Sequence, residues 1–162
     1  MFRIVLLLPF LTATGCVSVE GGSVEATWDL HTPDGRRIAK CSCSCPEIAK
    51  VRFSVVPAAG GEDLCSGREA CQFSCGAGQG GTPFDIPPGD YALSLIPVAA
   101  DGQDLVGAVP QEGGGMCSAQ SSMAPILRTI RRGRPTQLNT VVIKTDCAAD
   151  CGGFDTTRVC SK

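Results

Sequence analysis

The chain has 162 residues and a net charge of −2 at pH 7, with 20 glycines, 11 prolines and 11 cysteines. This length suits one domain with its own core and is short for two domains. The near-neutral charge argues against nucleic acid as a partner, because nucleic-acid-binding domains are usually strongly basic. Abundant glycine, proline and cysteine favour short strands, joined by turns and fastened by disulfides, over long helices.

The N-terminus has the layout of a secretory signal peptide. Arg3 is its only charge, residues 4–11 are apolar, and small residues then lead to Gly15 and Cys16. The apolar run is too short to cross a bilayer as a helix, which takes roughly 20 residues. We therefore predict a signal peptide over residues 1–15, removed on export.

The end of this segment resembles the lipobox of bacterial lipoproteins. The motif is Ala13-Thr14-Gly15-Cys16, in which Gly15 and Cys16 match and Ala13 replaces the usual Leu. The resemblance implies that Cys16 carries the acyl groups, palmitate among them, that anchor the chain in a membrane. In Gram-negative bacteria an Asp directly after the lipidated Cys retains such proteins in the inner membrane. This position is Val17 here, so the resemblance implies the outer membrane. The alternative is an ordinary secreted protein in which Cys16 is another thiol.

The cysteine count supports lipidation of Cys16. Without it ten cysteines remain of the 11, an even number that can pair fully in the oxidising compartment that an exported chain meets. The predicted disulfide-forming residues, with their pairing left open, are Cys41, Cys43, Cys45, Cys65, Cys71, Cys75, Cys117, Cys147, Cys151 and Cys160.

The alternating cysteines at 41, 43 and 45 form the most unusual local pattern. On a strand their sulfurs would share one face and would each reach another segment, such as the group at 65–75, Cys117 or the C-terminal tail. A thiolate metal site is the alternative, but export favours disulfides. We therefore predict no metal and no other cofactor.

Alternation of apolar and polar residues predicts about seven short strands. A short tether at 16–22, which includes the lipidated cysteine, precedes them, and its glycine pair is expected to make it flexible. Turns follow at 32–35 and 100–102. The segment 76–83 is predicted to be a glycine-rich loop, and 111–125 to be irregular. The predicted strands lie near 24–31, 47–56, 70–75, 91–98, 104–109, 126–131 and 136–145. With no amphipathic helix and no repeat, this pattern predicts a single antiparallel β-sandwich over residues 23–162.

Residues 86–102 (IPPGDYALSLIPVAADG) resemble the strand that a proline–glycine turn and a tyrosine introduce in prealbumin-like sandwiches. These include carboxypeptidase regulatory-like and collagen-adhesin B-type domains. Residues 132–143 are similar to their final hairpin, and the resemblance implies an Ig-like or prealbumin-like sandwich. In adhesin relatives a Lys and an Asn can form an isopeptide bond, for which Lys50 and Asn139 are the candidates, without an evident catalytic acid. The cysteine set instead resembles that of small secreted lipoproteins of predatory or soil bacteria.

Candidate catalytic residues are few. His31 is the only histidine, and because no G-x-S-x-G motif accompanies it we predict a surface residue near a strand end. Asp34 and the acids at 101–104 lack the ligand spacing of calcium loops and are predicted in turns. Trp28 and Phe53 lie on the apolar side of their strands and are predicted in the core, with sugar stacking as the alternative.

Arginines 128, 131, 132 and 134 form a local basic patch. The patch either contacts anionic lipid headgroups or envelope polysaccharide, or is a solvated turn. Together these features predict a lipid-anchored cell-envelope protein with a structural or protein-interaction role and no catalysis. Its partners would be the membrane and an envelope protein or glycan. The alternative is a small-ligand or polysaccharide-binding module at the cell surface, which should have an exposed aromatic or polar groove.

Overall fold

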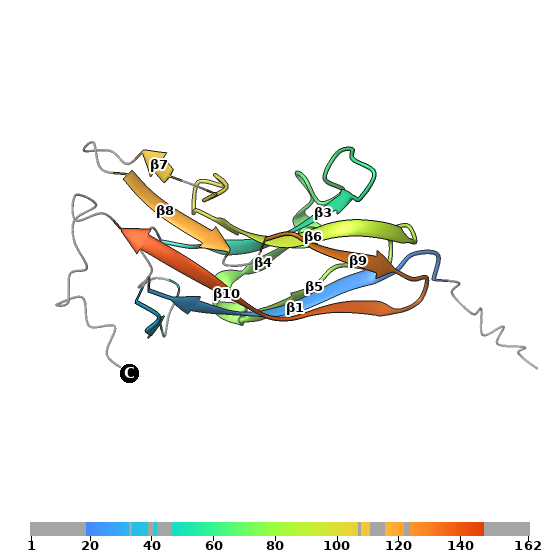
Figure 1. The fold of residues 1–162 in the computed structure, drawn as a ribbon, viewed down its shortest axis with the longest axis horizontal. Coiled ribbons are helices and arrows are strands. Elements are labelled where there is room, and N and C mark those ends of the chain that lie inside the picture. Colours follow the sequence, from blue (N-terminus) through green and yellow to red (C-terminus); the bar gives the residue numbers. More distant parts are fainter. Residues whose placement is uncertain are drawn as a thin grey trace, which may run out of the picture.

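The computed structural model describes residues 19–32, 34–38, 41, 47–106, 108–110, 116–121 and 124–147. In these residues the chain forms ten strands in two layers (Figure 1). The strands are β1 (Ser23–His31), β2 (Arg37–Ile38), β3 (Lys50–Pro57), β4 (Gln72–Ser74), β5 (Gln79–Gly81), β6 (Gly89–Val98), β7 (Ala108–Pro110), β8 (Met116–Ser121), β9 (Ile126–Ile130) and β10 (Pro135–Cys147). Two short 3-10 helices, η2 (Glu69–Cys71) and η3 (Cys75–Ala77), flank β4.

The predicted all-β sandwich is confirmed. One sheet has the order β2-β1-β10-β8-β7, with β5 also paired to β1, and the other has the order β4-β3-β6-β9. All pairings between these strands are antiparallel except that of β1 with β10, which is parallel from Ser23↔Pro135 to His31↔Lys144. This parallel pair departs from the expected antiparallel pattern, because β10 enters its sheet from the same end as β1.

The strands β9 and β10 do not form the predicted hairpin. β9 pairs with β6, whereas β10 pairs with β1 and β8, so the turn at Gly133 crosses from one sheet to the other. Two further predictions were incomplete, because β5 lies within 76–83 and β8 within 111–125. At Gly80 of β5 a Cβ would lie 2.6 Å from the ring of Phe73, so glycine is what lets this strand pass the ring.

The core lies between the two sheets and is made by the alternating apolar residues. Trp28 and Phe53 are buried in it, as predicted, and the indole Nε1 of Trp28 donates a hydrogen bond to the carbonyl of Cys75 (2.9 Å). Phe53 meets the ring of Phe73 edge to face, with 5.5 Å between the ring centroids. At the start of β6 the hydroxyl of Tyr91 donates to the carbonyl of Pro87 (2.9 Å) and fixes the turn that the sequence motif predicted.

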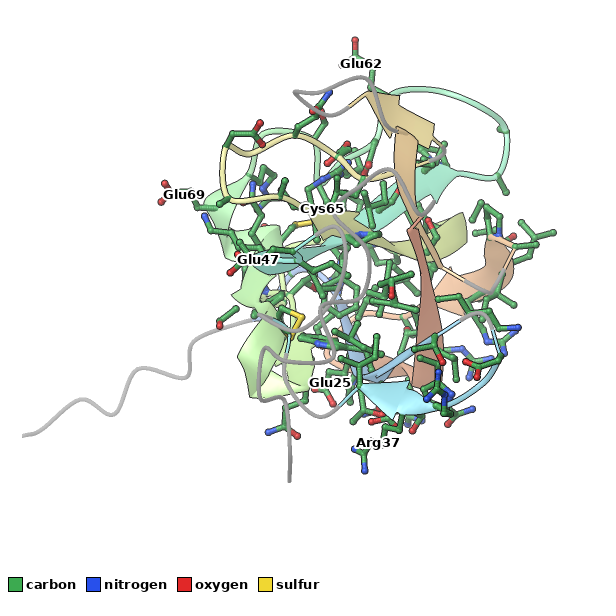
Figure 2. All side chains as sticks on the ribbon, turned by 90° about the vertical axis from the view of Figure 1, so that its left-hand side faces the viewer. Glu25, Arg37, Glu47, Glu62, Cys65 and Glu69 are labelled. Atoms are coloured by element: carbon green, nitrogen blue, oxygen red, sulfur yellow. A yellow bond between two sulfur atoms is a disulfide. The ribbon has the colours of Figure 1, made fainter. Side chains whose placement is uncertain are left out.

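Two disulfides fasten the described part of the chain, Cys41–Cys75 and Cys65–Cys71. Cys41 thus reaches the 65–75 group, as predicted. Figure 2 marks Cys65 inside the fold, with Glu62 and Glu69 pointing outward. The signal peptide and Cys16 lie outside the described residues, as do Cys43, Cys45, Cys151 and Cys160 and the side chains of Cys117 and Cys147.

The sandwich has two distinct ends. At what we call the N-terminal end, β1 begins beside the turn that joins β9 to β10 (Figure 1, right). At the far end, β1 finishes at His31 and β6 finishes at Val98. Within the described residues, no helix has the length and hydropathy that crossing a membrane requires.

Candidate functional site at the N-terminal end of the sandwich

The chain enters the sandwich through two buried glycines held by backbone hydrogen bonds. The N–H of Gly21 donates to the carbonyl of Phe84 (3.2 Å), and that of Gly22 donates to Ile86 (2.9 Å). The carbonyl of Gly21 accepts a bond from the N–H of Gly133 (2.8 Å) in the β9–β10 turn. The first residues of the fold are therefore tied directly to two turns at this end.

Only glycine fits at these two positions. A Cβ on Gly21 would lie 2.6 Å from the carbonyl carbon of Asp85, and one on Gly22 would lie 2.5 Å from the carbonyl oxygen of Arg131. Both neighbours are backbone atoms, which cannot move aside cheaply. The sequence suggested that this glycine pair gives the tether flexibility, but the structure places both glycines inside the packed domain.

A shallow open depression of about 570 Å³ lies beside the entry point. Its walls include Val19, Glu20, Phe84, Pro87 and Arg132. Val19 and Phe84 are 43% and 41% exposed, so apolar side chains face solvent next to charged ones. The depression thus combines an exposed aromatic ring with charged side chains.

The turn between β9 and β10 carries unpaired basic charge. Arg131, Arg132 and Arg134 are all exposed, and none of them takes part in the five ion pairs of the described residues. The acid Asp85 at the same end is already paired with Arg68. The predicted basic patch is therefore concentrated in this turn, with Arg128 apart from it on β9.

A second polar cluster, on the outer face of β3, was not predicted. Arg52 is 8% exposed and binds Asp63 (Nη1–Oδ2, 2.8 Å) and Asp104 (Nη2–Oδ2, 2.7 Å). The other oxygen of Asp63 accepts bonds from the N–H groups of Val55 (2.8 Å) and Cys65 (2.9 Å). The available signal was an arginine within an apolar strand whose flanking turns carry acids.

These contacts set the pKa values of the cluster. Burial acts to raise the pKa of Asp63, but the N–H donors of Val55 and Cys65, together with Arg52, hold it below its ordinary value. Burial likewise acts to lower the pKa of Arg52, and the carboxylates of Asp104 and Asp63 raise it above its ordinary value. The cluster is a charged brace between β3 and two loops.

The remaining candidate residues are dispersed. His31 lies half-buried at the end of β1, in register with Lys144 and Arg37, which agrees with its predicted place near a strand end. Lys50 and Asn139 are exposed on different sheets, so the structure does not bring this candidate isopeptide pair together. Among the described residues, no three His, Cys, Asp or Glu side chains are grouped to hold a metal ion.

The predicted turns at 32–35 and 100–102 are both present. Gly35 (φ +87°) donates its N–H to the carbonyl of Thr32, and the carboxylate of Asp34 is taken up by Thr32 and Arg36. In the second turn a carboxylate oxygen of Asp101 accepts a bond from the N–H of Gln103 (2.9 Å). These acids serve local turn geometry, as predicted.

No protein-family model matches the chain, and no curated protein matches it in sequence. Among solved structures, the minor pilin GBS52 of Streptococcus agalactiae aligns with a TM-score of 0.44 and 16% identity. The alignment covers 82% of this chain and 48% of that chain, so the present chain spans about half the length of the pilin.

Proposed function

We propose that this chain is a lipid-anchored cell-envelope protein whose β-sandwich has a structural or protein-interaction role and no catalytic activity. The observation that carries the proposal is the signal layout ending at Gly15 and Cys16, with a disulfide-fastened domain beginning a few residues later. Disulfides form and persist in oxidising compartments such as the periplasm. The Cys41–Cys75 and Cys65–Cys71 bonds therefore support export.

A non-catalytic role is supported by how the ionisable residues are used. His31 lies in register with two cationic residues, whereas a catalytic base needs a nucleophile and an orienting carboxylate beside it. The most buried charge among the described residues, Arg52, is satisfied by Asp63 and Asp104, and Asp63 is held by backbone donors. These contacts brace loops and leave no poised acid–base pair.

The second candidate function is a small-ligand or polysaccharide-binding module. It is favoured by the depression that contains the exposed ring of Phe84, because exposed aromatic rings stack on sugars. Calorimetric titration with purified envelope polysaccharide tests this function directly. Binding that is lost in Phe84→Ala would favour the second candidate over the first.

The primary proposal is tested by membrane fractionation of cells that produce the full chain. We expect wild type in the outer-membrane fraction, Cys16→Ser out of the membrane fractions, and Val17→Asp in the inner membrane. The matched control is Thr14→Ser, which changes the leader and keeps Cys16. Recovery of Cys16→Ser in the same membrane fraction as wild type would contradict lipid anchoring.

A further inference from the structure

Given the proposed lipid anchoring of Cys16, we infer that the N-terminal end of the sandwich docks on the anionic headgroups of the anchoring membrane. The contacts are made by Arg131, Arg132 and Arg134 of the β9–β10 turn, together with the exposed side chains of Val19 and Phe84. Docking holds the long axis of the sandwich away from the membrane plane and leaves the far end free for a partner.

The length of the connection keeps this end at the membrane. Three residue steps separate Cys16 from Val19, the first described residue. A fully extended chain covers at most about 3.6 Å per step, so this connection reaches no further than about 11 Å. One headgroup layer is roughly 5–8 Å thick, and charges interact over a Debye length of about 8 Å at physiological salt. The first residues of the fold therefore cannot leave the reach of the headgroups.

The fold places the basic turn at the same point. Gly21 is bonded through its carbonyl to the N–H of Gly133, in the middle of the turn. Val19 and Arg132 line the same depression. The arginines consequently lie next to the point where the tether joins the fold.

The charge of this end suits an anionic surface. Three exposed arginines within four residues of chain lie outside every ion pair of the described residues. Among the carboxylates nearby, Asp85 is paired with Arg68, whereas Glu20 and Asp90 keep their negative charge, Asp90 accepting a bond only from the neutral hydroxyl of Thr129. The three arginines of the turn still outnumber these two carboxylates. This local excess of positive charge occurs in a chain whose net charge is −2. Basic groups beside a membrane anchor bind anionic lipid through this attraction.

The apolar part of the surface suits the boundary between headgroups and acyl chains. Phe84 and Val19 project beside the arginines with 41% and 43% of their surface exposed. Apolar side chains flanked by basic ones insert at this boundary, while the arginine stems lie along it and keep their guanidinium groups with the phosphates. A polysaccharide would use the same aromatic ring, but it does not account for the position of the surface beside the tether.

The docking is tested with a tether that does not depend on acylation. The exported chain, carrying Cys16→Ser and an N-terminal hexahistidine tag, is held on nickel-chelating lipid in vesicles of phosphatidylcholine alone or mixed with phosphatidylglycerol. Phe84→Trp then reports contact through quenching by bromine-labelled lipids, against the constant signal of the buried Trp28. The matched control is Val106→Trp, a 62% exposed position that follows Leu105, whose N–H donates to the carbonyl of Pro97 near the far end.

We expect lipid quenching of Trp at position 84 in the anionic vesicles, little in the neutral ones, and none at position 106 in either. Replacing Arg131, Arg132 and Arg134 together by Gln should abolish the quenching. The change Arg36→Gln, Arg37→Gln and Lys144→Gln removes the same charge from the far end and should preserve it. For the untethered chain, each of the three turn arginines should contribute roughly a five-fold factor to binding of anionic vesicles.

Equal quenching at positions 84 and 106, or quenching that survives loss of the three turn arginines, would overturn the docking. Arginine-dependent binding of purified envelope polysaccharide with no quenching by lipid would assign the surface to a glycan instead. Failure of the anchor is a separate result, because the tag replaces the lipid here. If the tagged chain docks but the natural protein is not acylated at Cys16, the lipid-binding surface is supported and Cys16 is rejected as the anchor.

Discussion

Removing the buried guanidinium with Arg52→Met should destabilise the domain by about 2–3.5 kcal/mol. Asp104 is 45% exposed, so after screening by solvent its ion pair contributes less than about 1 kcal/mol. Asp63 is 17% exposed and would keep its two backbone donors but lose a charge-assisted bond, which contributes about 1.5–3 kcal/mol. Met fills much of the volume of the arginine stem, so little of the loss comes from packing.

Urea denaturation of wild type and of each variant measures the loss of unfolding free energy that each substitution causes. Asp104→Asn should cost less than about 1 kcal/mol. Asp63→Asn and Arg52→Met should each cost about 2–3.5 kcal/mol, and a double-mutant cycle between them should give a coupling of at least about 1 kcal/mol. Equal costs for Asp63→Asn and Asp104→Asn, or a coupling near zero, would refute the interpretation of this cluster as a buried brace.

Three further predictions concern acid, disulfides and close backbone contact. The fold lowers the pKa of Asp63 below its ordinary value of 3.8, so its ionised form stabilises the fold fully above pH 3.8 and this stabilisation is lost as the pH falls through the lowered pKa. Urea titrations should show a weaker acid-dependent loss of stability in Asp63→Asn than in wild type. Replacing Cys41 and Cys75 by Ala removes a disulfide that spans 34 residues and should cost about 3.8 kcal/mol of stability, whereas removing Cys65–Cys71, which spans 6, should cost about 2.2 kcal/mol. The reverse order of these costs in urea denaturation would contradict the chain-entropy explanation. Gly22→Ala should cost about 1–3 kcal/mol because its Cβ would meet Arg131 and Ile130 at 2.5 Å, whereas Gly76→Ala, with its nearest atom at 3.9 Å, should change the thermal midpoint little, and equal midpoints would count against this packing.

Alternation of residues predicted the main strands, but not all of their partners. The patterns around Trp28, Phe53 and Leu93 identify one buried face for each of β1, β3 and β6, and those faces form the core. The same period of two occurs in parallel and antiparallel strands, so the parallel pairing of β1 with β10 is not visible in it. Gly133 indicates a turn equally well whether the chain folds back within one sheet or crosses to the other.

The candidate surface was predictable in its parts and not in its assembly. Cys16 is separated in sequence from the arginines at 131–134 by more than a hundred residues, and the fold brings the N-terminal segment to the turn through backbone contacts such as the hydrogen bond between Gly133 and Gly21. Glycine at 21 and 22 indicated flexibility, because composition does not reveal that backbone atoms of Asp85 and Arg131 occupy the space of a side chain. Arg52 was missed because one of its two partners, Asp104, lies in a loop that is 52 residues away in sequence.

The mass of the mature N-terminal peptide tests the central claim most directly. The full chain is purified from its native envelope and digested, and the peptide that begins at Cys16 is measured by mass spectrometry beside the corresponding region of Cys16→Ser. We predict that the wild-type peptide starts at Cys16, lacks residues 1–15 and carries the added mass of acyl chains, and that Cys16→Ser carries none. A wild-type peptide of unmodified mass would contradict the account of this protein as a lipid-anchored envelope protein.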